Sequence, residues 1–311
     1  MALAHGIEAL LPPLCALGKA SIAGARNDFA PLLPSTLSTL TAAFAHSTQP
    51  SLIGLADELF CVFCDAPGAD SSFASMLDQL AEPALARLTA ASTPLDHPDL
   101  LCAILTIATK IAKLLAPALA AARCLPSLLS LSLSQLPICR QVEPAEAIVA
   151  FLEAVGRCTR VPHTAGAPST QAVTQQLRET FSRHVGGDTG AAILDGLIRG
   201  LADTLPPRTV AAAADVLAPL LHCDSWPGQA ATWAHASLAA LPAGADGVPG
   251  PQARQQLHDA LTTTPDPFAA LAEGGGVSLQ AVESLRTALS EFARVCRRMA
   301  DATELDRERY G

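Results

Sequence analysis

Cys61 and Cys64 have the CxxC spacing that could support redox or metal chemistry. A redox pair of this kind is expected in a βαβ context, and a structural zinc site needs a second pair of ligands nearby. The sequence offers neither, because no other CxxC and no close pair of histidines follows. The motif lies in a Leu- and Phe-rich stretch, so we predict two core cysteines on a helix, with neither a metal site nor a redox function.

The histidines and serines also lack the partners that catalysis requires. The histidines are dispersed and form no HExxH pair, and no GxSxG motif gives a serine the setting of a nucleophile. We therefore predict no catalytic residue, and expect capping, surface or core roles for the histidines. They are His5, His46, His97, His163, His184, His222, His235 and His258.

Two glycine-rich stretches and two tryptophans are the remaining candidates for a binding site. Gly186–Gly190 and Gly274–Gly276 are not followed by the lysine of a phosphate-binding loop, and no strand precedes them. They are expected to be loops or helix ends, and no cofactor is predicted. Trp226 and Trp233 are seven residues apart and could share one helix face, either as interface anchors or, as we favour, as core residues.

Composition narrows the class of protein. The chain has 311 residues, of which 50% are hydrophobic, 16% charged and 4% aromatic, with a net charge of −9. A nucleic-acid site needs a basic face, so no nucleic-acid partner is expected. Nine scattered cysteines without a disulfide framework indicate a reducing, intracellular compartment. Charges and prolines interrupt the apolar region 100–139, so we predict no membrane insertion.

The apolar residues recur with the period of a helix. Ala and Leu dominate and no run alternates strictly, so the fold is predicted to be all-α. Turn signals separate about a dozen helices, and short connections favour antiparallel pairs. A pair with its turns spans about 40 residues, the period of HEAT and armadillo repeats, although an irregular helical bundle would look similar. The three clearest apolar stripes are Leu100, Ile104, Ile107, Ile111 and Leu114; Leu194, Leu197, Ile198, Leu201 and Leu205; and Val210, Ala214, Leu217 and Leu221.

We predict a single array over residues 1–311, an α-solenoid that binds proteins and is not an enzyme. Loop insertions are expected near 161–169 and 243–251, which are rich in Gly, Pro and Ala. Asp96 should cap the helix that follows it, with Pro98 and Asp99 in its first turn. The stretch Arg294–Arg309 should end as a solvated helix, and the apolar residues 1–25, which carry no polar cap, should pack against a preceding repeat.

Four collinear stretches resemble the C-terminal part of importin-β superfamily nuclear transport receptors (karyopherins), in the importin-thirteen and transportin-SR branch. The resemblance covers most of the chain from about Asp28 onward and departs from the family in the two expected loops. Its motifs are Asp28–Leu33 with the paired helix 55–64; the Asp96–Asp99 helix start and its end at Lys113–Leu119; Thr209–Leu221 with Cys223-Asp224 and the Trp233 helix ending at Leu241-Pro242; and Phe292–Tyr310 with Cys296-Arg297-Arg298.

The resemblance implies a HEAT-repeat superhelix that carries protein cargo between cytoplasm and nucleus. It also implies the GTPase Ran and nucleoporins as partners. Family receptors are longer than this chain. The N-terminal repeats, which make most of the family's contacts with Ran, have no counterpart in it. The resemblance therefore does not carry Ran binding over to this polypeptide alone. No cargo-binding residue can be carried over, because no motif marks one.

Overall fold

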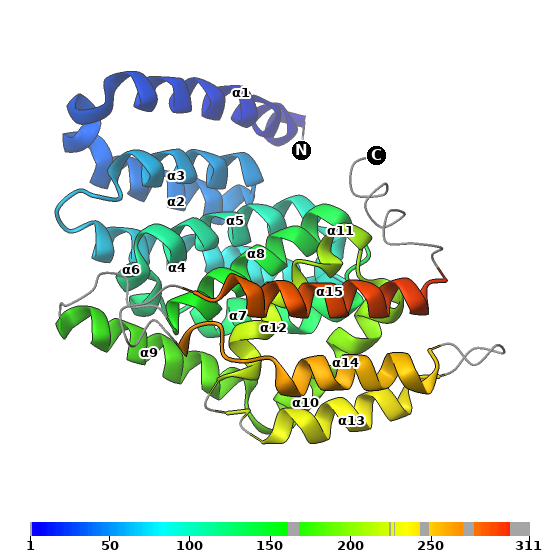
Figure 1. Cartoon of the computed structure of the whole chain (residues 1–311). Helices are drawn as coiled ribbons and strands as arrows, with labels where there is room; N and C mark the ends of the chain where they lie inside the picture. Colours follow the sequence, from blue (N-terminus) through cyan, green and yellow to red (C-terminus); the bar gives the residue numbers. More distant parts are fainter. Residues whose placement is uncertain are drawn as a thin grey trace. The chain divides into compact units, whose positions relative to one another are not determined.

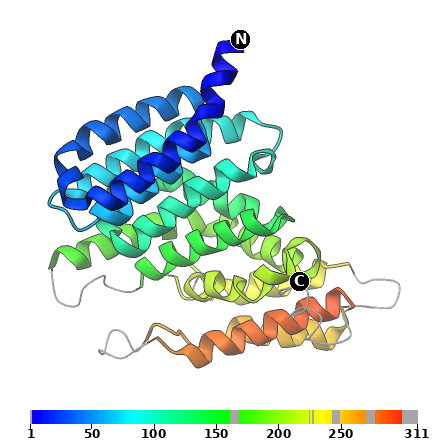
Figure 2. The same ribbon diagram turned by 90° about the horizontal axis from the view of Figure 1, so that it is seen from above.

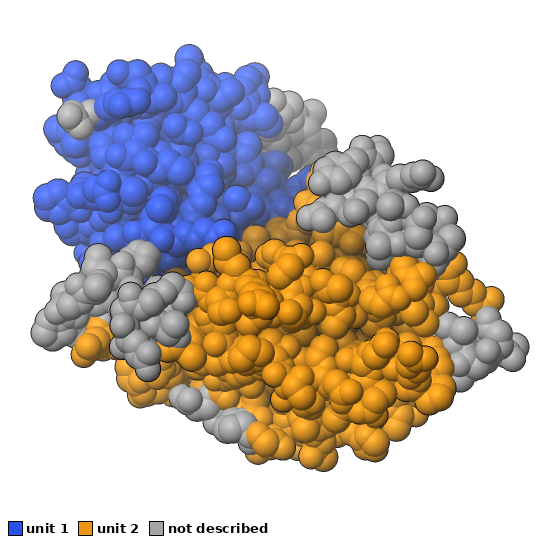
Figure 3. All heavy atoms as spheres, in the orientation of Figure 1, with its two compact units in different colours: residues 1–128 blue, residues 129–311 orange. Residues whose placement is uncertain are grey.

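The computed structural model describes residues 2–160, 168–223, 225–226, 228–242, 249–269 and 277–298, with side chains from Leu10 onward except those of 27 and 168–170. Within these ranges every regular element is a helix or a helical turn, and none is a strand (Figures 1 and 2). The prediction of an all-α fold is confirmed. Contacts divide the chain into two compact units, residues 1–128 and 129–311, which are coloured separately in Figure 3.

Unit 1 is built from two layers of helices. In one layer α1 packs on α3 and α3 packs on α5, while in the other α2 packs on α4 and α4 packs on α6. Consecutive helices therefore alternate between layers, as antiparallel pairs joined by short turns do. The elements are α1 (Ala2–Ala25), η1 (Arg26–Leu32), α2 (Leu33–Ser47), α3 (Pro50–Phe63), α4 (Ala69–Ala90), η2 (Pro94–Asp96), α5 (Pro98–Leu114) and α6 (Ala116–Ala121).

Prolines set where several of these helices begin. Pro50 and Pro98 occupy the first positions of α3 and α5, where a missing N–H is tolerated. Before α2 the chain forms the 3₁₀ turn η1, which contains Pro31. The cap predicted for α5 is wrong. The Asp96 carboxylate accepts the N–H of Thr93 at 3.0 Å, which closes a capping box on η2, and α5 begins without a side-chain cap.

The core of unit 1 contains the predicted stripe on α5. Leu100, Ile104, Ile107 and Ile111 are buried, whereas Leu114, at the end of the helix, is exposed. Aromatic rings fill the space between α3 and α4, where Phe60 and Phe73 meet edge to face at 5.1 Å. Such contacts add to the stabilisation from buried apolar area. The helical period read from the sequence therefore identifies the buried face of α5 correctly.

One face of α1 has no neighbour among the described residues. Cys15 and Ile22 are buried towards α3, while Leu10, Leu14 and Leu17 are 58%, 58% and 66% exposed. The spacing of these leucines places them on one side of the helix. The expected apolar, uncapped face at this end is therefore present in the described part of α1.

Unit 2 also has two layers. The helices α8, α12 and α15 pack on one another in that order, and α10, α13 and α14 form a second row (Figure 1). The helices α13, α14 and α15 run up and down in succession (Figure 1), and α14 packs against both of the others. The elements, beginning with one that spans the unit boundary, are α7 (Leu125–Gln135), η3 (Leu136–Ile138), α8 (Val142–Cys158), α9 (Pro168–Val185), α10 (Gly187–Arg199), the π turn η4 (Gly200–Thr204), α11 (Pro207–Val210), α12 (Ala213–Leu221), α13 (Gln229–Ala240), α14 (Pro251–Thr263) and α15 (Leu279–Cys296).

In unit 2 the other two predicted apolar stripes are confirmed, and the bounds of three predicted segments are corrected. Every residue of the stripes beginning at Leu194 and Val210 is buried. The predicted loops 161–169 and 243–251 lie mostly outside the described residues. Within these ranges α9 begins at Pro168 and α14 begins at Pro251. Proline is favoured in the first turn of a helix, which explains both starts. The predicted helix Arg294–Arg309 is interrupted near its start, since α15 stops at Cys296 and Arg298 has a φ of 61°, while residues 299–309 lie outside the described ranges.

No helix in the described part of the chain is long and apolar enough to cross a membrane. The interruptions seen in the apolar region 100–139 have a structural counterpart. Helix α5 ends at Leu114, the six-residue α6 follows it, and α7 begins only at Leu125. Breaks between short helices thus divide the most hydrophobic part of the sequence.

Candidate protein-binding groove

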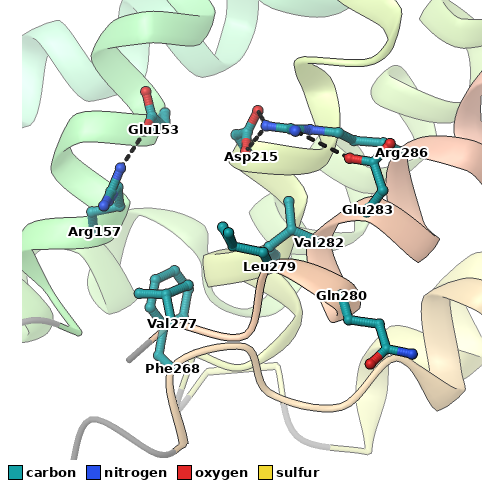
Figure 4. Close-up of a pocket in the computed structure, with 11 residues that line it drawn as sticks. Glu153, Arg157, Asp215, Phe268, Val277, Leu279, Gln280, Val282, Glu283 and Arg286 are labelled. Carbon is teal, nitrogen blue, oxygen red and sulfur yellow. Dashed lines mark hydrogen bonds and ion pairs between the residues drawn. The ribbon is translucent and has the colours of Figure 1, made fainter. Parts of the chain in front are cut away.

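A groove of about 580 Å³ runs over the layer formed by α8, α12 and α15 in unit 2. Its walls carry charged side chains, and apolar side chains line the space between them (Figure 4). Leu279, at the first position of α15, is 78% exposed at its edge. The lining residues are Glu153, Arg157, Asp215, Ala218, Phe268, Val277, Leu279, Gln280, Val282, Glu283 and Arg286.

A glycine sets the spacing of two of the walls. A Cβ atom at Gly156 of α8 would lie 2.6 Å from Cγ of Pro219 in α12. Because the proline ring is rigid, only a residue without a side chain lets the two helices approach this closely. Glu153 and Arg157 flank this point on α8, and Ala218 faces the groove beside Pro219. The position of both charged side chains thus depends on the close contact of α8 with α12.

Arginines pair with the carboxylates of the groove. One nitrogen of Arg286 lies 2.8 and 2.9 Å from the two oxygens of Asp215, and the other contacts Glu283 at 3.3 Å (Figure 4). The hydrogen bond with Asp215 raises the pKa of Arg286, against the effect of burial. On the opposite wall Arg157 pairs with Glu153 at 3.2 Å. Three carboxylates therefore share two guanidinium groups, which leaves the groove slightly acidic.

Phe268 is held at the floor of the groove by contacts from outside it. Its backbone N–H donates to the Asp266 carboxylate at 3.0 Å, and the Arg160 guanidinium lies 5.9 Å from the centre of its ring. Arg160 forms an ion pair with Asp266 and donates to the carbonyl of His222 at 2.7 Å. The N–H of Ser278 donates to the carbonyl of Pro267 at 2.7 Å. These contacts hold the backbone at Pro267 and Phe268 in place next to Ser278.

His222 lies beside Arg160, and its pKa depends on its burial and on the charges near it. Burial lowers the pKa of the imidazole, Asp266 raises it, and Arg160 lowers it. Its Nε2 atom is buried and has no hydrogen-bond partner among the residues that the structure describes. Because the pKa of His222 is lowered overall, the folded protein holds a neutral ring at pH values at which the unfolded chain would bind a proton. The free energy of unfolding should therefore depend on pH.

Acidification is expected to destabilise the wild-type chain through His222. Above about pH 6.5 both states are neutral at this site, and the stabilising contribution is complete. As the pH falls below that value the unfolded chain takes up a proton first, so stability is lost until the folded pKa is reached. We expect His222→Leu to flatten this part of the stability profile, measured by urea denaturation at several pH values. An unchanged slope in the variant would contradict this assignment.

The groove has the character of a binding surface. Its described lining contains no cysteine, histidine, serine or lysine, so it offers no nucleophile and no general base other than arginine-paired carboxylates. No group of three or more described His, Cys, Asp or Glu residues lies close enough to hold a metal ion. Apolar contacts with a charged rim are the features that binding sites for peptides and proteins share.

The structure contradicts one prediction about the CxxC motif. None of the nine cysteines, all of which lie in the described ranges, forms a disulfide, but only five of them are buried, and Cys61 is exposed while Cys64 is half-buried. The core positions of this helix are taken by Phe60 and Phe63. The helical period turns Cys61 away from that face, and Cys64 lies just past the end of the helix, so the prediction that both are core residues is wrong.

The tryptophans belong to the core but not to a shared helix. Trp226 is buried and precedes α13, whereas Trp233 lies on α13 and is half-buried. Their rings meet edge to face at 5.4 Å, and Trp226 donates its indole N–H to the carbonyl of Val185 at 2.6 Å. The core role that we favoured is confirmed for Trp226, and the shared helix face is wrong because the helix begins only at Gln229.

The other candidates are dispersed over the fold. Gly186–Gly190 forms the start of α10, as predicted for a helix end, while Gly274–Gly276 lies outside the described residues. His97 precedes α5, and His235 and His258 form an edge-to-face ring pair at 6.0 Å. His163 and the side chain of His5 lie outside the described part. None of these histidines lines the groove.

Sequence reasoning did not find the groove. Its walls come from residues 153–157, 215–218 and 277–286, and the Asp215–Arg286 pair joins positions 71 apart. The one local signal is the pair Glu283 and Arg286, which can interact on the exposed face of a helix. Surface pairs of this kind are too common to mark a site.

Comparison with known proteins adds no family. No protein-family model matches the chain. No curated protein sequence matches it significantly. The importin-β resemblance therefore stays a prediction.

Proposed function

We propose that this chain is a protein-binding segment of a nuclear transport receptor and that the groove over α8, α12 and α15 is one of its binding surfaces. The observation that carries the binding part is the open groove, with its apolar floor and arginine–carboxylate rim, on a layer of packed helices. Stacked helical pairs expose long surfaces that suit large partners. Catalysis is not part of the proposal.

The transport part is supported by the resemblance and by where its stretches lie. Asp28–Leu33 falls on η1 and the start of α2, Asp96–Asp99 on the start of α5, and Thr209–Leu221 on α11 and α12. These three stretches therefore lie at helix starts or span whole helices, whereas the fourth, Phe292–Tyr310, begins inside α15 and lies mostly outside the described residues. Cytoplasm and nucleus are the compartments that this proposal implies, with protein cargo, Ran and nucleoporins as the partners.

A general helical scaffold is the second candidate. The same two-layered packing of helices and the same groove would serve a cytoplasmic protein that assembles other proteins without transporting them. The two candidates differ in their response to the nucleotide of Ran, because only a transport receptor should distinguish GTP from GDP.

The binding part of the proposal predicts that Leu279→Asp removes protein partners. An acidic residue at the start of a helix is tolerated, so the substitution should leave the fold intact while placing charge at the apolar edge of the groove. Proteins that the wild-type chain recovers from a cell extract should be retained at least about tenfold less by the variant, as expected for an interface anchor. The matched control is Val142→Asp, since Val142 is also exposed at the first position of a helix, α8, but does not line the groove. Equal loss in both variants, or in neither, would exclude the groove as the binding surface.

The transport part is tested with Ran itself. The chain, extended by any helical repeats encoded in frame upstream, is immobilised and offered Ran loaded with GTP or with GDP. Preferential recovery of the GTP form is expected. Equal recovery of the two forms, or recovery of neither, would refute the receptor and leave the general scaffold.

A further inference from the structure

The two cysteines of the CxxC motif lie at the exposed end of α3. Cys61 is in the last turn of the helix, and Cys64 is the first residue after it. Phe60 and Phe63 occupy the core side of the same turn and are buried. A thiol pair that the core does not enclose is open to small oxidants, unlike the five buried cysteines of the chain.

A lysine and a carboxylate flank Cys61. The Nζ atom of Lys110, on α5, lies 3.7 Å from the Cys61 sulfur and 2.6 Å from an oxygen of Asp57. Asp57 is one helical turn before Cys61 on α3, so both side chains lie on the same side of the helix. A neighbouring ammonium group favours the thiolate, which is the form of cysteine that attacks oxidants.

We propose that Cys61 and Cys64 form a peroxide-sensitive dithiol, in which Cys61 attacks, Cys64 resolves, and Lys110 and Asp57 set the rate. The Cys61 thiolate attacks one oxygen of hydrogen peroxide, the O–O bond breaks, and water leaves after hydroxide takes up the proton lost by the thiol. The Cys64 thiol then attacks the sulfur of the resulting sulfenic acid, and a second water leaves as the S–S bond forms. In total two thiols and one peroxide give one disulfide and two waters.

The backbone allows this bond with a small movement. Residues three apart on a helix have Cβ atoms about 5–6 Å apart, and a disulfide needs about 3.5–4.5 Å. The end of α3 must therefore tighten by roughly 1–2 Å. Cys64 already lies in the turn after the helix, so closure distorts the terminal turn and leaves the buried part of α3 in place.

The surroundings of Cys61 make the reaction slow at neutral pH. Burial and then the Asp57 carboxylate raise the pKa of the Cys61 thiol, and Lys110 only partly opposes them. Burial and then Asp65 raise the pKa of Cys64. Because the thiolate fraction grows as the pH approaches the pKa, the rate of oxidation should rise with pH.

The experiment compares all nine thiols in one sample of the full chain. The folded protein is treated with a small excess of hydrogen peroxide, remaining thiols are alkylated, and peptides are quantified by mass spectrometry. Cys61 and Cys64 should disappear together as an internal disulfide, ahead of the half-buried Cys102 and Cys296. In the Cys64→Ser variant a sulfenic acid at Cys61 should be trapped by dimedone. Oxidation of Cys61 no faster than that of Cys102 and Cys296, or failure of the pair to bond, would overturn the proposal.

Charge variants separate this arrangement from simple exposure. Asp57→Asn should speed the oxidation of Cys61 by about threefold for each unit by which the pKa falls, since the tenfold gain in thiolate is partly offset by weaker nucleophilicity. Lys110→Met should slow it and shift the pH profile to higher pH. Asp70→Asn, which changes an exposed carboxylate at the start of α4, is the matched control and should have no effect. Equal rates in all three variants would show that Lys110 and Asp57 do not set the rate.

Discussion

Replacing Gly190 by alanine is expected to lower the free energy of unfolding of unit 2 by about 3 kcal/mol. A Cβ atom at this position of α10 would lie 2.5 Å from the carbonyl oxygen of Val185 and 2.8 Å from the ring of Trp233. The oxygen belongs to the backbone and accepts the indole N–H of Trp226, so moving it breaks a buried hydrogen bond. Neither neighbour can give way without disturbing the aromatic pair.

Fluorescence of the two tryptophans measures this effect, because both lie in unit 2 and report its denaturation by urea. The matched control is Gly24→Ala in α1, where a Cβ atom meets nothing within 4 Å. That exchange should stabilise α1 by roughly 0.5–1 kcal/mol through helix propensity, visible by circular dichroism, and leave the tryptophan transition in place. A Gly190→Ala midpoint equal to that of the wild type would disprove the close contact.

Replacing Arg297 by leucine is expected to cost about 2–3 kcal/mol of stability in unit 2. Its guanidinium group donates to the carbonyls of Gly200, Leu201 and Leu205 at 2.7–3.2 Å. Gly200 and Leu201 belong to the π turn that follows α10, and Leu205 is the first residue after that turn. Hydrogen bonds from a charged donor are stronger than neutral ones, and the half-buried carbonyls would lose them together.

Two comparisons make this test specific. Arg297→Lys keeps the charge but cannot reach several carbonyls at once, so it should recover only a minor part of the loss. Arg140→Leu removes an exposed pair with Asp203 of the same turn, and should change stability by less than about 1 kcal/mol. Both are measured by urea denaturation. A loss at Arg140 as large as that at Arg297 would mean that charge, and not the bonding of carbonyls, stabilises the turn.

The periodic features of the sequence predicted much of the fold. The stripes on α5, α10 and α12 are buried almost throughout, because a helix must turn its apolar side chains to a neighbour. Helix ends were less predictable. Asp96 was expected to cap α5, yet its carboxylate reaches back to Thr93, since a short polar side chain can bond on either side of its own position.

The candidate site was not predictable in the same way. The groove joins Asp215 with Arg286, 71 residues later, and depends on the contact of Gly156 with Pro219. Each of these residues is ordinary in its local sequence. Only the packing of α8, α12 and α15 makes them neighbours, and no periodicity along one helix contains that information.

The sequence by itself determined the all-helical class and the buried faces of α5, α10 and α12, because both follow from local propensity and from the spacing of apolar residues. The tertiary structure decided what the chemically suggestive residues do. Cys61 and Cys64 were expected in the core, but Phe60 and Phe63 fill it, which leaves Cys61 exposed beside Lys110 and Cys64 half-buried. Phe60 and Phe63 lie in the same helical turn as Cys61, next to Cys64. Their larger apolar rings gain more free energy from burial than the thiols do.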